Sequence, residues 1–295
     1  MKKAFLELHL SVFLAGFTGI LGKLITLNEG MLVWYRLLIT AVTMYVLFRW
    51  QGKLKKLPLR DVMRIGGVGC IVALHWIFFY GSIKYANVSI GVVCFSLTSL
   101  FTAVFDPLIS RRRFDKMEMF LSMLTLAGIL LIFHFDTQYR TGIVLGIISS
   151  MFAALFTVLN KKLVVKYDTA NITFYELGVG FLALTAVMPF YLHAFPVESF
   201  VPGLTDTVYL LALSWFCTVW MYTLSMNALK KISPFTVNLC FNLEPLYSII
   251  LAFILFHENK LLHGGFYYGL GLILLSVVLQ MLRVARQAKR APAAH

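Results

Sequence analysis

The sequence predicts an all-α integral membrane protein with ten transmembrane helices, arranged as two inverted five-helix repeats. Three observations predict this class: an apolar composition, ten apolar runs of membrane-spanning length, and an internal repeat. Of the 295 residues, 60% are hydrophobic and only 13% are charged. Because a soluble domain carries about 25% charged residues, this chain would expose long apolar faces if it folded in water. The bilayer is the solvent that suits it.

The ten apolar runs each have about 20 residues, the length that crosses the hydrocarbon core of a bilayer. They cover residues 4–27, 31–49, 64–83, 87–109, 117–135, 142–160, 172–192, 207–229, 234–256 and 264–283. The first run is longer than the apolar part of a signal peptide and lacks a small-residue cleavage site. We therefore interpret it as an uncleaved transmembrane span.

The basic residues fall mainly in every second connection between the runs. These connections are 2–3, 49–64, 111–116, 161–166, 230–231 and 283–290. Because cytoplasmic loops carry the excess of Lys and Arg, this alternation predicts both termini in the cytoplasm and a multi-pass protein of the bacterial inner (plasma) membrane. The clusters orient the chain, with binding of anionic lipid headgroups as the alternative. The formal net charge of +13 does not predict nucleic-acid binding, since the basic residues share no polar face.

The second half of the chain repeats the first. With a shift of 146 residues, Cys94, Phe95, Leu97 and Leu100 align with Cys240, Phe241, Leu243 and Leu246, and Lys84 aligns with Lys230. Similar shifts align Gly22-Lys23 with Asn160-Lys161 and Trp34-Tyr35-Arg36-Leu37 with Phe174-Tyr175-Glu176-Leu177. We therefore divide the chain into a first repeat over 1–140, a second over 141–284 and a basic cytoplasmic tail over 285–295.

An odd number of spans in each repeat makes the second repeat enter the membrane from the opposite side. Two inverted halves can exchange conformations and so expose a site at the membrane midplane first to one side and then to the other. The alternative is a duplicated membrane scaffold that transports nothing.

The paired five-helix halves resemble the EamA-type transporters of the drug/metabolite transporter superfamily. Pro245, Leu246 and Glu258 match the second-half pattern of that family, a turn, Pro-Leu and an apolar helix that closes on Glu. The first half departs from the pattern, with Ser99 in place of the Pro and Arg112 where the Glu would stand. The resemblance implies ten helices around a central cavity and the export or uptake of amino acids or related small metabolites.

Glu244 is the strongest candidate for a substrate or coupling residue. A charged group in the middle of a span is costly and usually faces a partner or a wet cavity, and Pro245 disrupts the backbone bonding beside it. The carboxyl group could bind a substrate ammonium group, or take and release a proton. The alternative is a structural cap on backbone groups freed by Pro245.

Polar residues near Glu244 are further candidates for substrate contacts. Asn238 and Asn242 share a helix face, whereas Glu244 lies about 160° from Asn242 in an unbroken helix. A break at Pro245 or a wide cavity would let all three reach one solute. Thr98 and Ser99 take the places of Glu244 and Pro245 in the first half, which makes that half neutral at this position.

Aromatic residues in the third and eighth spans could line the cavity. Trp76 aligns with Tyr222 under the 146-residue shift, and both rings could stack on an apolar or aromatic substrate. His75 could line the cavity or relay protons. Helix packing is the alternative for all three.

Arg36 and Glu176 occupy matching positions in spans two and seven, near opposite membrane faces if the repeat is inverted. They are therefore not expected to pair with each other. Each could be a gate residue on its own side, or a side chain that extends to the interface. Tyr35, beside Arg36, could belong to the cavity rim or to an interfacial aromatic belt.

The sequence contains no HExxH, GxSxG or phosphate-loop motif, so we predict no catalytic residue, no metal and no cofactor. The four cysteines lie inside apolar runs and are interpreted as packing residues. The predicted function is secondary transport of a small molecule, with an intramembrane enzyme or a scaffold as the alternative. The expected partners are that solute and the lipid bilayer, and the sequence leaves a monomer and a homodimer both open.

Overall fold

The computed structural model describes residues 2–133, 139–197, 200–257 and 264–290, and these residues form helices and connections without a β-strand. The helices are α1 Lys2–Ala15, α2 Thr18–Leu24, α3 Glu29–Trp50, α4 Leu59–Tyr85, α5 Val88–Phe95, α6 Thr98–Ser110, α7 Lys116–Phe133, α8 Arg140–Lys166, α9 Thr169–Ala194, α10 Leu204–Ser214, α11 Met221–Leu229, α12 Pro234–Phe241, α13 Glu244–Phe256 and α14 Gly264–Arg290, with the π-helix η2 Trp215–Trp220 between α10 and α11.

These helices confirm the predicted membrane fold. Within the described ranges, nine helical segments are long and apolar enough to cross a membrane, and α7 occupies the position of the remaining predicted span. Four of the spans are interrupted, because α1–α2, α5–α6, α10–η2–α11 and α12–α13 each form one span. The helix α14 continues to Arg290, so the first part of the predicted tail is helical; residues 291–295 and Glu258 lie outside the described residues.

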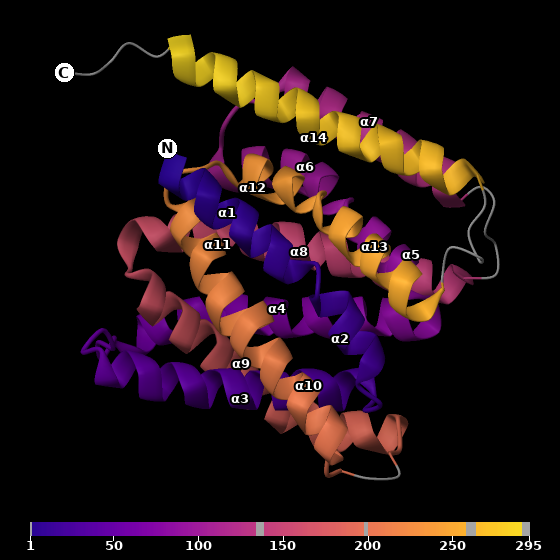
Figure 1. Ribbon diagram of the computed structural model, residues 1–295. Coiled ribbons are helices and arrows are strands. Elements are labelled where there is room, and N and C mark those ends of the chain that lie inside the picture. The colour runs from indigo at the N-terminus through magenta and orange to yellow at the C-terminus, as the bar shows by residue number, and fades with distance from the viewer. Residues whose placement is uncertain (1, 134–138, 198–199, 258–263, 291–295) are drawn as a thin grey trace.

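The connections that carry the basic clusters meet at one end of the molecule. Lys55 Nζ forms an ion pair with Asp168 at 2.9 Å, and Lys166 Nζ forms one with Asp61 at 3.3 Å. Lys162 donates a hydrogen bond to the carbonyl oxygen of Ile109 at 2.6 Å. The start of α1 and the end of α14 lie at this same end, which is the left side of Figure 1. We call it the basic end.

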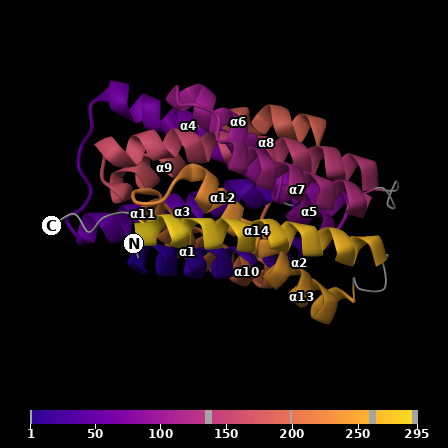
Figure 2. The same ribbon diagram turned by 90° about the horizontal axis from the view of Figure 1, so that it is seen from above.

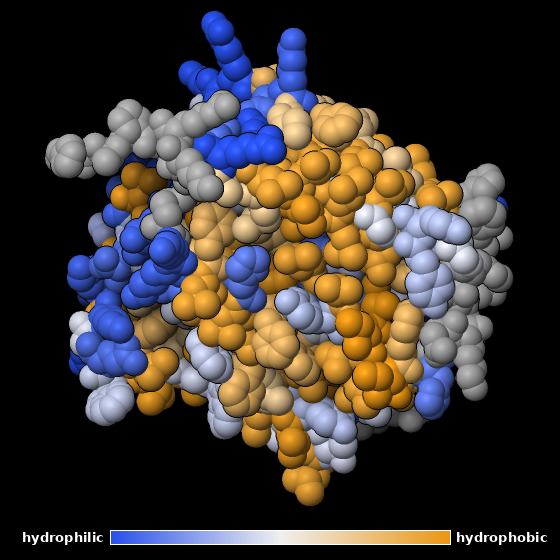
Figure 3. Space-filling view, turned by 45° about the horizontal axis from the view of Figure 1, so that its top comes forward, coloured by the Kyte–Doolittle hydropathy of each residue, from blue (hydrophilic) through white to orange (hydrophobic). Residues whose placement is uncertain are grey.

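The surface between the two ends is apolar. Large apolar side chains such as Val42, Leu130 and Phe190 are exposed, and Figure 3 shows a broad hydrophobic face with hydrophilic atoms gathered mostly toward the basic end. Lipid chains rather than water suit such a surface. This arrangement agrees with the alternation of basic connections along the sequence.

The two halves share detailed backbone features at the 146-residue shift. Asn87 caps the first turn of α5, and Ser233 caps the first turn of α12. The spans break after Phe95 and after Phe241, and they end at Arg111 and His257, the two non-glycine residues with positive φ among those described. The repeated sequence therefore encodes a repeated interrupted helix.

The two halves have opposite orientations. The span α5–α6 begins next to Lys84, whose ammonium group donates to the carbonyl oxygens of Ile25 and Leu27 at the end opposite the basic one. The span α12–α13 begins next to Ile232, whose carbonyl oxygen accepts a hydrogen bond from Lys161 at the basic end. Corresponding helices thus start at opposite ends, as an inverted repeat requires.

Helices of the two halves interleave around the centre. The helix α4 packs along α8 and α9, and α7 packs along α14 at the periphery, where Figures 1 and 2 show the two side by side. Two glycines permit the closest contact between α4 and α9. A Cβ atom on Gly69 would lie 1.8 Å from the carbonyl oxygen of Glu176, and one on Gly180 would lie 2.7 Å from that of Gly69.

We predict that Gly69→Ala destabilises the protein, because the added methyl group meets backbone atoms of α9 that can move only with the whole helix. Overpacking of this kind costs about 1–3 kcal/mol or more. Gly67→Ala is the matched control on the same helix, since a Cβ atom there meets nothing within 4 Å. Thermal unfolding in detergent should show a lower melting temperature for Gly69→Ala alone; equal melting temperatures would contradict the close contact.

Candidate functional site

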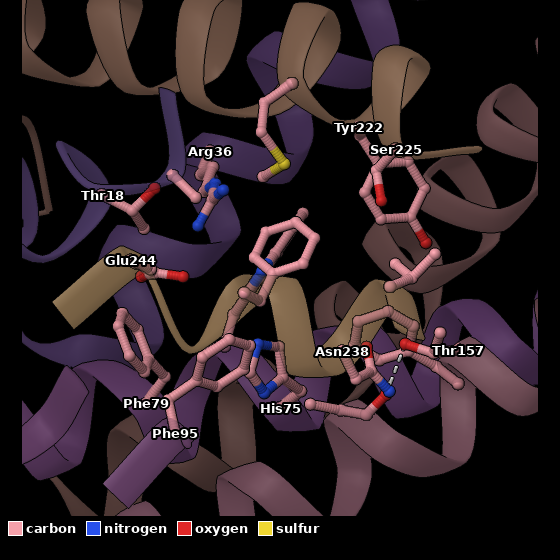
Figure 4. Close-up of a pocket in the computed structure, with 17 residues that line it drawn as sticks. Thr18, Arg36, His75, Phe79, Phe95, Thr157, Tyr222, Ser225, Asn238 and Glu244 are labelled. Carbon is pink, nitrogen blue, oxygen red and sulfur yellow. Dashed lines mark hydrogen bonds between the residues drawn. The ribbon is translucent and has the colours of Figure 1, made fainter. Parts of the chain in front are cut away.

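A cavity lies between the two halves and is the candidate functional site. The space open to the centre of a water molecule is about 70 Å³, room for a few waters or one small solute group. Its walls come from α1 to α5 and from α8, α11, α12 and α13. They comprise Ala15, Thr18, Arg36, His75, Trp76, Phe79, Phe95, Ala153, Phe156, Thr157, Met221, Tyr222, Ser225, Val237, Asn238, Phe241 and Glu244. Most of these side chains are apolar, so the few polar groups stand out (Figure 4).

Glu244 reaches the cavity because the helix is interrupted just before it. The helix α12 ends at Phe241, and α13 begins at Glu244 with Pro245 in its first turn. Proline fits this position because the first-turn N–H groups have no partner within the helix. The carboxyl group lies at the positive end of the α13 dipole, which favours a negative charge. The break therefore falls at Asn242-Leu243, slightly before the predicted position at Pro245.

Glu244 is 4% exposed, and its carboxyl group forms no hydrogen bond or ion pair with the described residues. The first turn of α13 has no side-chain cap. No hydrogen bond from Glu244 to a backbone group is found among the described residues, so the alternative interpretation, that Glu244 caps backbone groups freed by Pro245, finds no support there. The group is available for a solute or a proton.

Arg36 lines the same cavity from the helix α3, and it is fully buried. Its Nε atom donates to Thr218 Oγ1 at 2.7 Å, and its two terminal nitrogens donate to Tyr80 Oη at 2.7 Å and to the carbonyl oxygen of Cys217 at 2.9 Å. The guanidinium carbon also lies 3.8 Å from the centre of the Trp76 ring. The interpretation of Arg36 as a side chain that extends to the membrane interface is therefore wrong.

Two of the three hydrogen-bond partners of Arg36 belong to the π-helix of the second half. Both Cys217 and Thr218 belong to η2, a rare helix type that is frequent at functional sites. Figure 4 shows Arg36 and Glu244 on the same side of the cavity. The described residues place no ion pair between them, so the cavity presents two opposite charges that do not contact each other.

The predicted aromatic residues and His75 all line the cavity. His75 Nδ1 lies 3.0 Å from the carbonyl oxygen of Ser149 and 2.9 Å from its hydroxyl, so His75 is both a hydrogen-bonded packing residue and part of the wall. Trp76 contacts Arg36, and Tyr222 donates a hydrogen bond to Glu176 at 2.8 Å. The aligned pair Trp76 and Tyr222 thus contacts the aligned pair Arg36 and Glu176, each within its own half.

Of the two asparagines, only Asn238 reaches the cavity. Its amide donates to Thr102 Oγ1 at 2.7 Å. Asn242 is fully buried and donates to Ser99 Oγ at 3.4 Å, while Thr98 and Ser99 donate to carbonyl oxygens of their own span. Asn242, Thr98 and Ser99 therefore lie where the two interrupted spans meet, behind the wall, and their substrate contact stays a prediction.

The remaining gate candidates lie away from the wall. Glu176 is fully buried behind Tyr222, so its interpretation as an interfacial side chain is wrong, as it is for Arg36. Tyr35 is half-buried, and its hydroxyl donates to the carbonyl oxygen of Phe200 at 2.8 Å. Arg36 and Glu176 form no ion pair with each other, as expected. The gating roles of all three residues stay predictions.

Several residues of the site were not predicted from the sequence. They are Tyr80, Thr218 and Cys217 around Arg36, Ser149 beside His75, and the wall residues Phe79, Phe95, Phe156, Thr157, Ser225 and Phe241. Among these residues, only Phe95 and Phe241 could have been noticed in the sequence, because they align with each other in the internal repeat.

The fold and the cavity together define a multi-pass membrane protein with an internal cavity between its two halves. The chain belongs to the EamA-like transporter family, whose model matches residues 3–134 and again residues 140–282. It is therefore a membrane transporter rather than an enzyme.

Relatives agree with this class. An uncharacterized transporter of Archaeoglobus fulgidus is 26% identical over 86% of this chain and 89% of its own length. The pseudopaline exporter CntI of Pseudomonas aeruginosa is 25% identical over 55% of this chain and 57% of its own. A protein of known crystal structure shares the fold with a TM-score of 0.71 at 16% identity, over 95% of this chain and 98% of the other.

We predict that Arg36→Lys destabilises the protein although it keeps the charge. An ammonium group cannot reproduce the planar set of three hydrogen bonds and the stacking on Trp76. Each buried polar group left without a partner costs about 1–3 kcal/mol. The melting temperature in detergent should fall clearly, whereas Arg49→Lys, at an exposed position of the same helix, should leave it unchanged. A wild-type melting temperature for Arg36→Lys would contradict this role.

Proposed function

We propose that the chain is a proton-coupled secondary transporter that exports a small metabolite, an amino acid or a related compound, by alternating access. The observation that carries the proposal is Glu244, a buried carboxyl group without a protein partner among the described residues, at a helix break in a cavity between two inverted halves.

The inverted halves support alternating access. The cavity receives residues from both halves, and each half has an interrupted span at the same position of its repeat. If the halves exchange conformations, the same residues face the other side of the membrane. A site between related halves is the arrangement that this mechanism needs.

Glu244 and Arg36 support a polar or zwitterionic solute. An anionic group of the solute could approach Arg36 and a cationic group could approach Glu244, while the apolar wall accepts its carbon skeleton. Glu244 can instead take a proton when the solute has left, since Arg36 is bonded to Tyr80, Thr218 and Cys217 and forms no ion pair with it, and a buried carboxylate without an ion-pair partner is costly.

Two further observations support the direction of transport and the membrane location. The relative CntI is named as an exporter of pseudopaline, which favours the outward direction. The basic end carries most of the Lys and Arg, and the positive-inside rule places that end, with both termini, in the cytoplasm of a bacterial inner membrane.

Counterflow in proteoliposomes tests the transport function. Vesicles loaded with one unlabelled metabolite should accumulate the labelled form of the same metabolite from outside, with saturation. A panel of amino acids and related metabolites covers the proposed class. Failure of every member to exchange above protein-free vesicles would overturn the proposal.

We predict that Glu244→Gln abolishes accumulation driven by a pH gradient but retains counterflow. Glutamine keeps the shape and polarity of the side chain and removes the proton site. Glu7→Gln is the control, since Glu7 lies in the first helix beside Lys3, away from the cavity wall. Normal proton-driven accumulation by Glu244→Gln would exclude Glu244 as the coupling residue.

A further inference from the structure

Glu176 uses only one of its two carboxyl oxygens. Its Oε1 atom accepts hydrogen bonds from Asn160 Nδ2 at 2.9 Å and from Tyr222 Oη at 2.8 Å. Its Oε2 atom is buried and has no partner among the described residues, and the same is true of Asn160 Oδ1. Two residues that already share a hydrogen bond thus each leave one buried oxygen unfilled.

Both unfilled atoms are acceptors when Glu176 is ionised, so neither can satisfy the other. A proton on Oε2 makes that atom a donor, and Asn160 Oδ1 is an unfilled acceptor on the residue already bonded to Oε1. Leaving a buried polar atom unpaired is unfavourable. Protonation therefore turns one of the two unpaired acceptors into a donor.

Among the described residues, no cation forms an ion pair with Glu176. The helix α3 also packs against α9, but its Arg36 is bonded to Tyr80, Thr218 and Cys217. From α11 the titratable group in contact is the Tyr222 hydroxyl, and from α8 the contact is the neutral amide of Asn160. The helix α4 approaches with the backbone of Gly69, and no ion pair joins Glu176 to any described residue. An isolated buried carboxylate in such a site is costly.

We propose that Glu176 is a second proton-binding site, which holds a proton on Oε2 in this conformation and donates it to Asn160 Oδ1. The proton comes from water at the basic end and adds to the carboxylate to give the neutral acid. Glu176 lies seven residues from the start of α9 at that end, about 10 Å along the helix. The ionised form of Glu176 has to be hydrated by water, so release of the proton requires the basic end to open.

Tyr222 connects this site to the cavity. The ring of Tyr222 belongs to the cavity wall, and its hydroxyl is within hydrogen-bond distance of both Glu176 and Asn160. A change in the charge of Glu176 therefore changes the hydrogen bonds that hold a wall residue. The site is separate from Glu244, which no described hydrogen bond joins to it. The proposal builds on the proposed transport, but the proton site can be tested without it.

Infrared spectroscopy of the purified protein tests the proton site directly, because a carboxylic acid and a carboxylate absorb at different frequencies. The wild type at neutral pH should show a component of the acid carbonyl absorption that Glu176→Gln removes, and any component from Glu244 should remain. Glu118→Gln is the matched control, since the carboxylate of Glu118 forms an ion pair with Arg112 at 2.6 Å and should contribute no such band. An identical acid band in wild type and Glu176→Gln would overturn the proposal.

Thermal stability gives a second test. The amide of Glu176→Gln can accept at one atom and donate to Asn160 Oδ1 at the other, so it imitates the protonated acid. This variant should melt like the wild type at neutral pH and above it at alkaline pH, where the wild type must lose the proton. A variant that melts well below the wild type at every pH would show that Glu176 is ionised and would overturn the proposal.

Tyr222→Phe keeps the carboxyl group and removes one donor to it, so the acid band should persist to higher pH than in the wild type. An unchanged pH range would contradict the contact between Tyr222 and Glu176. If these tests succeed while every counterflow assay fails, the proton site stands and the proposed transport falls. If counterflow succeeds and the acid band of Glu176 is absent, the proposed transport stands and the proton site falls.

Discussion

The structure depends on one constraint: hydrocarbon offers no hydrogen bonds, so every interruption of a transmembrane helix must be satisfied by the protein itself. The described residues contain four interrupted spans, and polar side chains of other helices donate to carbonyl oxygens beside three of them. Ser248 donates to Gly16 at 2.7 Å, Ser150 to Cys94 at 2.7 Å and Arg36 to Cys217 at 2.9 Å. These contacts tie the interruptions to the helices around them.

The same contacts join the two halves. Ser248 and Cys217 belong to the second half, and Gly16 and Arg36 belong to the first. Where the spans α5–α6 and α12–α13 face each other, Asn238 and Asn242 of the second half donate to Thr102 and Ser99 of the first. Hydrogen bonds of this kind can be exchanged for equivalent ones at little net free energy. These hydrogen bonds join the halves beside the apolar contacts of their shared core.

Hydropathy and charge predicted the spans, their alternation and the inverted repeat, because the bilayer imposes those features on every part of the chain. The environment of single residues was harder to predict. Arg36 looked like an interfacial side chain because Thr218 and Cys217 lie about 180 residues away in a π-helix that no local pattern indicates. Phenylalanines of the cavity wall, such as Phe79 and Phe156, cannot be told apart by hydropathy from phenylalanines that face lipid. Glu244 was found because a charge inside an apolar run is conspicuous.

The position of Glu244 explains why its half differs from the other. By helical rise it lies about 15 Å from the start of α12 and about 18 Å from the end of α13, near the midpoint of its span. If the halves exchange conformations, a charge at the midpoint changes the side it faces while it hardly moves through hydrocarbon. Thr98, at the matching position of the first half, is neutral and lies behind the cavity wall. The repeat therefore keeps the helix break in both halves, and the carboxyl group in one.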